Sequence, residues 1–366
     1  MKIVQIIRNF SAGGAERFVI DLSNQLFHLG NDVTIIRFFD EANQNTLENS
    51  LNEGVHVLTI KKKPGLDSMF IFKLFKVIKG LNPDVLHTHL NGFNYSILPF
   101  LFLRNIKYFH TIHSMPLKES KNKLDFLVKK ILFKFKFVFP ISISEQVHIE
   151  SLKYYGDTIK LIYNGRVKPN KGVKYENVKK EINRISKGNV IPTILNIGNF
   201  KEAKNQKILI QIINELNESG IKVNLVILGG VKSGLKFNEL SEISNFEFIH
   251  FLGTVDNSTD YMYCCDYFCL SSLWEGMPIS LIEAFSTRCL SICTPAGGII
   301  NMVKPHYNGL LSSGFDKESL KKQLKIAISL PKNDKEVILD NAYNDFINLF
   351  SIEQCADRYF NYFLSK

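Results

Sequence analysis

The sequence has few of the residues that mark membrane-spanning, disulfide-rich or zinc-binding proteins. It contains one tryptophan and six cysteines in 366 residues, and its longest apolar run, 97–103, is shorter than the roughly 18 residues that cross a bilayer. The apolar start is interrupted by Arg8 and followed by no small-residue cleavage site, which favours a buried strand over a signal peptide. Since there is no CxxC pair, we expect small reduced core residues at Cys264, Cys265, Cys269, Cys289, Cys293 and Cys355.

The rest of the composition is that of a globular protein, with 45% hydrophobic and 22% charged residues, and the length allows two domains with separate cores. The net charge of +10 is concentrated in the first half. Residues 1–165 carry 21 basic and 14 acidic side chains, against 24 and 21 in the remainder. This excess indicates an anionic surface or acceptor as a partner, and we expect no nucleic acid.

Hydrophobic periodicity predicts alternating strands and helices, which favours parallel sheets in an α/β fold. In the first half the predicted helices cover 15–29 and about 68–80, and the predicted strands cover 3–7, 33–38, 55–60, 84–87 and 107–113. The second half ends in a helical region over about 336–364, after strands at 193–197, 223–228, 246–251, 267–270 and 290–293.

These patterns predict two Rossmann-like domains that face a central cleft. The first domain covers 1–167, a Lys- and Asn-rich linker covers 168–190, and the second domain covers 191–344. A C-terminal helix over about 345–366 is expected to follow, in a position to pack back on the first domain.

The segment from Ser272 to Glu283 carries the strongest functional signal. It follows the strand predicted at 267–270, and this strand–loop–helix order is where α/β folds bind ligands. Pro278 fits the first helical turn, so Glu275 lies on the approach loop and Glu283 about a turn and a half further on. The free N–H groups of that turn favour a phosphate, and the carboxylates favour hydroxyls on either side of it. A sugar nucleotide fits this pattern, although two solvated glutamates around an ordinary helix start have the same spacing.

In the form SLWEGMPISLIEA, this segment resembles the E-x7-E signature of the retaining glycosyltransferases of family 4. The resemblance implies a GT-B fold and transfer of a sugar from a nucleoside diphosphate by same-face attack, which the leaving phosphate assists. It also implies that Glu275 holds the hydroxyls of the donor sugar and that Glu283 binds the ribose. The residues implied to help hold the sugar and phosphates are Gly276, Met277, Pro278 and Ile279.

Two adjacent glycines, Gly13 and Gly14, follow the first predicted strand and open the first predicted helix. Such a pair lets a phosphate approach the backbone closely, although adjacent glycines more often simply form a tight turn. The GGAE form resembles the glycine-rich N-terminal loop of family 4, which implies that both glycines contact the donor phosphates.

His113 ends the strand predicted at 107–113, where cleft residues are expected in an open sheet. A single histidine at a strand end is more often structural. In family 4, however, a histidine in this T-x-H-S context reaches the transferred sugar or the reaction centre, so the resemblance implies a catalytic role for His113. His87 and His89, near the end of the preceding strand, are candidates for lining the same cleft.

Lys204 follows the first strand of the second domain, where a lysine can neutralise the charge of a leaving diphosphate. A solvated loop lysine is the alternative. The loop resembles the family pattern G-R-x4-to-5-K-N, with Asn199 in place of the arginine. The resemblance thus implies that Lys204 is catalytic and that Asn199 belongs to a donor site with one positive charge fewer, unless Lys201 replaces it.

A later glycine turn at 295–298 resembles the G-G-x-x-E turn of the same family, with Asn301 in place of the glutamate. The resemblance covers about residues 1–325, and its strongest motifs lie in the second domain.

A basic amphipathic helix is predicted within 118–137. Seven lysines stand there against two acidic residues, and apolar residues recur among them at helical spacing. Such a helix can lie on an anionic membrane, which suits a lipid-linked acceptor. A core-packed helix with a solvated lysine face is an equally good interpretation.

We therefore predict a glycosyltransferase that moves a sugar from a nucleoside-diphosphate sugar to a glycan or lipid-linked acceptor in bacterial surface polysaccharide synthesis. A sugar-nucleotide epimerase, a phosphorylase and a non-catalytic glycan-binding subunit on the same fold are the alternatives. No DxD-like acidic pair ends a predicted strand, so we expect no metal or other cofactor. We expect a cytoplasmic location, with or without peripheral attachment to the inner face of the membrane.

Overall fold

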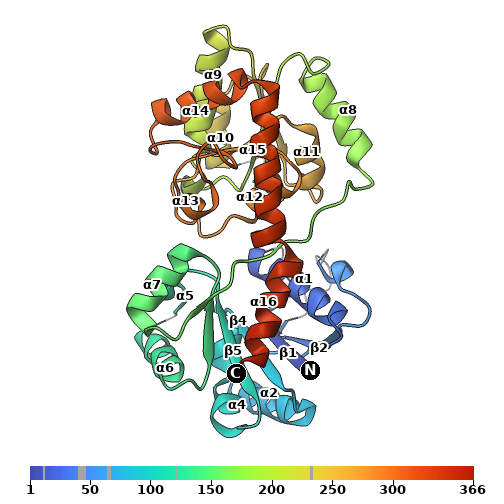
Figure 1. Ribbon diagram of the computed structural model, residues 1–366, viewed down its shortest axis with the longest axis vertical. Coiled ribbons are helices and arrows are strands. Elements are labelled where there is room, and N and C mark those ends of the chain that lie inside the picture. The colour runs from blue at the N-terminus through green and yellow to red at the C-terminus, as the bar shows by residue number, and fades with distance from the viewer. Residues whose placement is uncertain (11–12, 40–46, 64–66, 121, 231–233) are drawn as a thin grey trace. The chain divides into compact units, whose positions relative to one another are not determined.

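The computed structural model describes the chain except for residues 11–12, 40–46, 64–66, 121 and 231–233 (Figure 1). The described chain forms two compact units. Unit 1 comprises Met1–Val167 together with Leu349–Lys366, and unit 2 comprises Lys168–Asn348. Each unit contains one parallel sheet flanked by helices, which confirms the predicted α/β architecture of two Rossmann-like domains.

Unit 1 is built on a seven-stranded sheet in the order β3-β2-β1-β4-β5-β6-β7, with every neighbouring pair parallel. Its strands are β1 (Lys2–Ile7), β2 (Asp32–Arg37), β3 (His56–Thr59), β4 (Val85–His89), β5 (Lys107–Ile112), β6 (Phe139–Ser142) and β7 (Lys160–Leu161).

Two hydrophobic clusters cover the two faces of this sheet, because the strands are buried on both sides. On one face α1 (Gly14–His28) and α16 (Ile352–Leu364) pack against Ile3 and Ile7 of β1. On the other face a layer of helices packs against Val4 and Ile6. The helices that contribute to this second cluster are α2 (Ser68–Leu81), α3 (Gly92–Tyr95), α4 (Ile97–Phe102), α6 (Lys123–Lys134) and α7 (Glu145–Tyr155). The short helices η1 (Glu48–Ser50) and α5 (Pro116–Glu119) lie in the connections.

The C-terminal helix belongs to unit 1. Figure 1 shows α16 beside α1, and Tyr359 and Phe363 of α16 are fully buried in the cluster that α1 helps to form. An added Cβ at Gly165 would lie 2.5 Å from the Cβ of Cys355, so the chain approaches α16 too closely for a side chain at this position.

The prediction of unbroken helix over about 336–364 is wrong. The chain forms α15 (Lys332–Asp345), a π-helical segment (Phe346–Phe350) and then α16. The break occurs because Ser351 leaves the helix to bridge Arg166, and its side chain then caps α16 by accepting from the N–H of Gln354.

Unit 2 is built on a six-stranded parallel sheet in the order β10-β9-β8-β11-β12-β13. Its strands are β8 (Thr193–Ile197), β9 (Asn224–Leu228), β10 (Ile249–Gly253), β11 (Tyr267–Leu270), β12 (Leu290–Cys293) and β13 (Leu310–Leu311). In addition to α15, its helices are α8 (Tyr175–Ile185), η2 (Glu202–Lys204), α9 (Gln206–Glu218), α10 (Leu235–Glu242), α11 (Ser258–Cys264), α12 (Ile279–Ser286), α13 (Ile299–Met302) and α14 (Lys317–Ser329).

The segment predicted as a linker, 168–190, is instead largely a folded part of unit 2. It contains α8, whose Val178 and Ile182 lie one turn apart and are buried, and α8 packs along α11. The N–H of Gly172 also donates to the Asp260 carboxylate at 2.7 Å. The many polar residues of this stretch concealed the two apolar positions that give α8 its buried face.

The cysteines are free thiols as expected, and all but Cys264 are buried. Among the described residues, no helix has both the length and the apolar character of a membrane span.

Candidate active site

The sheet of unit 2 reverses its winding between β8 and β11. These strands are neighbours, while the chain proceeds from β8 to β9 on one side and from β11 to β12 on the other. At such a switch point the loops at the carboxyl ends of the strands diverge and leave room for a ligand. Lys204 lies in the loop after β8 and Glu275 in the loop after β11, so two residues predicted from separate motifs meet at this place.

The two predicted side chains contact each other directly. Lys204 Nζ donates to Glu275 Oε1 at 2.6 Å, and the side chains are only 26% and 11% exposed. Ser272 Oγ donates to the same carboxylate oxygen at 2.7 Å. This serine lies three residues before Glu275, and its role went unnoticed in the sequence although it belongs to the same motif. The result is a carboxylate held in one orientation beside a partly accessible ammonium group.

Backbone contacts also join the two loops. Ser271 Oγ donates to the carbonyl of Lys204 at 2.9 Å, and the N–H of Leu273 donates to the carbonyl of Ala203 at 2.8 Å. Because these bonds hold the backbone on both sides, the Lys204–Glu275 pair does not depend on side-chain packing alone.

The glycine turn at 295–298 packs against the Glu275 loop. The N–H of Gly298 donates to the carbonyl of Glu275 at 3.2 Å. A Cβ at Gly298 would lie 1.7 Å from the carbonyl oxygen of Gly276, and Gly297 adopts a φ of +55°. Only glycine permits this approach, so the turn has a structural reason independent of Asn301.

Helix α12 begins one residue later than predicted. Pro278 is its N-cap, with φ −71° and ψ 115°, and Ile279 is the first helical residue. Met277 and Pro278 are buried, whereas Gly276 and Ile279 are partly exposed, so the start of the helix is partly accessible to solvent. Glu283 lies in the second turn and is only 8% exposed. An anion at this end would meet N–H groups that have no acceptor within the helix.

Asn199 has a structural contact in the same region. Its side-chain oxygen accepts from the N–H of Gly230 at 3.2 Å, which ties the loop after β8 to the loop after β9. Gly198 lies against the aliphatic part of Lys204, since an added Cβ would come within 3.3 Å of it. Asn199 therefore shapes the loop that carries Lys204, and its contact with a donor remains a prediction.

Unit 1 has a corresponding switch point between β1 and β4. Gly13 is the N-cap of α1 and Gly14 its first residue, at the end of the segment that connects β1 to α1. A Cβ at Gly13 would lie 2.1 Å from Oε2 of Glu16, so a side chain there would require the Glu16 carboxylate to move.

His113 follows β5 and is part of a hydrogen-bonded chain. Its Nε2 lies 2.9 Å from Nδ1 of His89, and Nε2 of His89 lies 2.8 Å from Oε1 of Gln5. Burial lowers the pKa of His113 to about 4, so the ring is neutral near pH 7. His87 does not join this chain, because its Nε2 pairs with Thr111 Oγ1 at 2.7 Å in the core.

Glu119 organises the other side of the His113 loop. Its carboxylate accepts from the backbone N–H of His113 at 2.9 Å, from His110 Nε2 at 2.8 Å and from Lys129 Nζ at 3.3 Å. Burial by itself raises the pKa of Glu119, but the hydrogen bond and charge of His110 and the charge of Lys129 outweigh it and lower the pKa to about 2. Nothing in the sequence marked Glu119, since its partners come together only in the fold.

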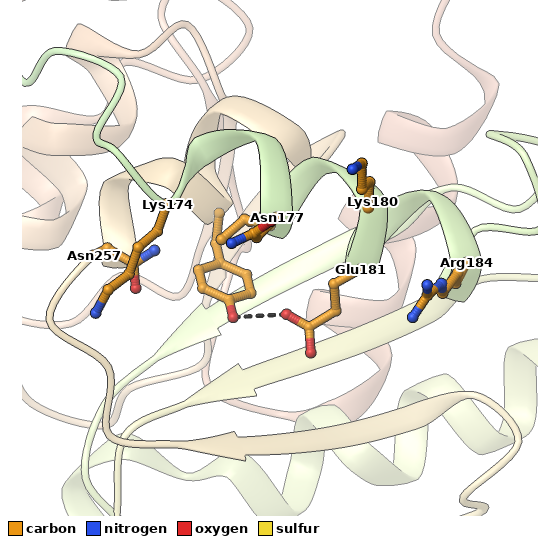
Figure 2. Close-up of a pocket in the computed structure, with 8 residues that line it drawn as sticks. Lys174, Asn177, Lys180, Glu181, Arg184 and Asn257 are labelled. Atoms are coloured by element: carbon orange, nitrogen blue, oxygen red, sulfur yellow. Dashed lines mark hydrogen bonds between the residues drawn. The ribbon is translucent and has the colours of Figure 1, made fainter.

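A surface pocket of about 430 Å³ lies elsewhere on unit 2, between α8 and α11. Figure 2 shows Lys174, Lys180 and Arg184 along its edge. The Tyr261 hydroxyl donates to Glu181 Oε2 at 2.8 Å. None of the residues predicted to bind the donor lines this pocket. Within the described part of the chain, no three His, Cys, Asp or Glu side chains are grouped as a metal site requires.

Two family models match the chain. Residues 12–166 match the model described as Glycosyltransferase Family 4, and residues 176–345 match the model described as Glycosyl transferases group 1. The chain belongs to glycosyltransferase family 4. The matched regions contain the predicted site residues of both units, so the resemblance seen in the motifs extends over nearly the whole length.

Individual relatives agree with this assignment. The chain is 28% identical over 312 residues to the capsular polysaccharide biosynthesis glycosyltransferase CapH of Staphylococcus aureus, with 80% of this chain and 81% of the relative covered. It is 24% identical over 351 residues to an α-1,4-N-acetyl-D-galactosaminyltransferase of Campylobacter jejuni, with 93% and 92% covered. The fold resembles that of Anabaena HepE, crystallised with UDP, with a TM-score of 0.81 over the whole of both chains at 17% identity.

The predicted enzyme class is therefore confirmed: the protein is a glycosyltransferase with a GT-B fold. The epimerase, phosphorylase and non-catalytic alternatives have no support from the comparisons.

Proposed function

We propose that this family 4 enzyme transfers a sugar from a UDP-sugar, with retention of configuration, to a glycan carried on a diphospho-lipid, as a step in surface polysaccharide synthesis. Three similarities support the proposal. The Campylobacter relative is named for a glycan linked to PP-undecaprenol, the Staphylococcus relative for capsular polysaccharide, and the Anabaena structure contains UDP.

The observation that carries the proposal is the partly buried ion pair of Lys204 and Glu275 at the switch point of unit 2. In the proposed complex Glu275 accepts hydrogen bonds from the donor sugar, and Glu283 accepts them from the ribose. The backbone from Gly276 to Ile279 faces the sugar and phosphates. Lys204 then exchanges its contact with Glu275 for one with the diphosphate, where negative charge develops as the glycosidic bond breaks.

This arrangement performs the charge stabilisation that a divalent cation supplies in other transferases. We propose that the leaving diphosphate is stabilised by Lys204 and the amide end of α12, with no metal cofactor. The acceptor hydroxyl attacks the face that the diphosphate leaves, and a phosphate oxygen takes its proton, so the anomeric configuration is retained. In unit 1, Gly13 and Gly14 contact the phosphates and His113 contacts the transferred sugar.

Donor binding can be tested through Trp274, the only tryptophan in the chain and the neighbour of Glu275. We expect UDP-sugars, but not GDP-sugars, to change its fluorescence and raise the melting temperature. We also expect slow release of UDP in water, unchanged by EDTA. If no nucleotide sugar binds or is hydrolysed, the proposed donor site is wrong, and if EDTA abolishes hydrolysis, the proposed metal independence is wrong.

We also propose that α6 contacts an anionic membrane surface. Leu124, Leu127, Ile131 and Phe135 are spaced as one helical stripe, and each is between 45% and 68% exposed. The lysines around this stripe, Lys123, Lys130, Lys134 and Lys136, are exposed as well. The buried residues of the helix are Lys129, Leu132 and Phe133. The solvated face is therefore apolar as well as basic, which a helix that merely covers the core does not require.

Vesicle sedimentation tests this contact. We expect the protein to sediment with phosphatidylglycerol-containing vesicles but not with phosphatidylcholine alone. Changing Leu127→Glu and Ile131→Glu together should weaken binding by tenfold or more, because two apolar side chains of about 1.5–3 kcal/mol each are lost. Val337→Glu, at a residue of unit 2 that is also 60% exposed, is the matched control. Equal binding by both variants would contradict the role of α6.

A further inference from the structure

Gln5 is an unexpected residue in the middle of β1. The strand reads KIVQII and is the third of seven in the unit 1 sheet, with strands paired on both sides, and Gln5 is fully buried between apolar neighbours. Its Oε1 lies 2.8 Å from Nε2 of His89, but its Nε2 has no hydrogen-bond partner among the described residues. A buried amide with one unsatisfied end destabilises a core, so this glutamine needs a reason other than packing.

The reason is that Gln5 is hydrogen-bonded to His89, which is in turn hydrogen-bonded to His113. His89 is fully buried and His113 partly so, and burial lowers the pKa of both rings, that of His89 well below its usual value. Two neutral imidazoles whose nitrogens lie 2.9 Å apart share one proton, so one ring donates and the other accepts. The tautomer of one ring therefore fixes the tautomer of the other.

The orientation of the Gln5 amide determines which atoms donate and which accept in the hydrogen bonds from Gln5 through His89 to His113. Its carbonyl oxygen accepts only if His89 carries its proton on Nε2, which leaves Nδ1 of His89 as a bare acceptor. His113 must then carry its proton on Nε2 to donate to His89, and its own Nδ1 is left bare. The opposite orientation of the Gln5 amide would reverse every donor and acceptor along the chain.

We propose that Gln5 and His89 are positioning residues that fix the tautomer of His113, so that its Nδ1 accepts a hydrogen bond from a substrate hydroxyl. The hydroxyl of the substrate rests on the proposed function, whereas the tautomer is a property of the free protein. No hydrogen bond to Nδ1 of His113 is present within the described part of the chain, so this nitrogen is available to a ligand.

Aromatic contacts keep the two rings in place. Phe18 of α1 packs edge-on against both His89 and His113, with ring centroids 6.2 and 5.9 Å away. The ring centroid of His87 lies 4.1 Å from that of His89. Because the rings cannot easily turn over, the hydrogen-bond direction set at Gln5 reaches His113 without a change of geometry.

The tautomer can be measured directly by long-range ¹H–¹⁵N NMR on the ¹⁵N-labelled full chain without ligand, with His113 assigned from a His113→Gln spectrum. We expect a protonated Nε2 and a bare Nδ1. In Gln5→Met the acceptor is lost, and His113 should shift to the Nδ1-protonated form. Gln5→Glu, measured near pH 8, keeps an acceptor and should keep the original tautomer. Thr34→Val, in the neighbouring strand β2, is the control for loss of a buried polar group.

Kinetics give a second readout on any UDP-sugar that the wild type hydrolyses. Gln5→Met should lower kcat about tenfold with KM changed less than about twofold, the effect of one hydrogen bond made in the transition state. A wild-type His113 protonated on Nδ1, or an unchanged tautomer in Gln5→Met, would overturn the proposal. If Gln5→Met does not fold, the His113 tautomer is compared instead between the wild type and Gln5→Leu. If no donor is hydrolysed, the proposed function fails, while the spectra still decide the role of Gln5.

Discussion

Changing Lys204→Ala should lower the kcat for donor hydrolysis and for sugar transfer by about 10²–10³-fold, the usual cost of removing one group that stabilises transition-state charge. Lys204 is a partly buried cation at the switch point of unit 2. Its backbone carbonyl accepts a hydrogen bond from Ser271 Oγ, which keeps the lysine beside Glu275. Release of UDP from a UDP-sugar, followed by coupled assay or chromatography, measures the effect.

Two further lysines make this result specific. Lys207→Ala removes an exposed lysine three residues further along the chain, in α9, and should leave the rate unchanged. Lys201→Ala tests whether Lys201 supplies the charge missing at Asn199. A loss confined to Lys201→Ala, with Lys204→Ala retaining the wild-type rate, would assign leaving-group stabilisation to Lys201 instead.

Glu119→Ala should destabilise unit 1 by about 3–5 kcal/mol, because it removes the nearer carboxylate partner of the buried Lys129 ammonium and leaves Asp125 at 3.9 Å. His110 and the backbone of His113 lose an acceptor at the same time. Hydrogen exchange of the β5 amides measures unit 1. Trp274 fluorescence during urea unfolding follows unit 2, so the two units can be monitored separately.

Glu53→Ala, at an exposed position of unit 1, is the matched control and should change stability by less than about 0.5 kcal/mol. The double variant Glu119→Leu with Lys129→Met should recover part of the loss, because it removes both charges of the pair. Equal protection of β5 in the wild type and in Glu119→Ala would show that this cluster does not stabilise the unit.

The same cluster makes unit 1 sensitive to acid. The pKa of His113 is about 4 in the folded protein against 6.5 for an ordinary histidine, and that of Glu119 is about 2 against 4.5. In both cases the unfolded chain binds the proton first, so stability falls as the pH drops. Protonation of His113 should lower the stability of unit 1 between about pH 6.5 and 4, and protonation of Glu119 should lower it further below about pH 4.5. Glu119→Ala should lose the decrease below pH 4.5.

The main features of the site were readable in the sequence because they are local. One continuous segment contains the strand at 267–270, the Glu275 loop and the helix that follows. These elements are therefore neighbours in the fold because they are neighbours in the sequence. The position of Lys204 after the first strand of its domain is local in the same sense. Parallel α/β sheets bring the carboxyl ends of neighbouring strands together, and for that reason separate motifs could be expected to meet.

Partners that are distant in the sequence could not be predicted in this way. Gln5 and His89 are 84 positions apart, and Glu119 is chosen as the partner of Lys129 only by the packing of α6. The composition of 168–190 suggested a linker because two buried residues in a polar helix are a weak signal without the surface of α11 against which they pack.

For this protein the sequence by itself determined the fold class, the enzyme family and the segments that carry the site, since hydrophobic periodicity and glycine-rich turns act over a few neighbouring residues. Only the tertiary structure decided which side chains are partners. It joined Lys204 to Glu275, linked Gln5 to His113, and turned the apolar stripe of α6 outward. Hydrogen-bond direction and burial depend on what the fold places opposite each group, and periodicity within one segment does not contain that information.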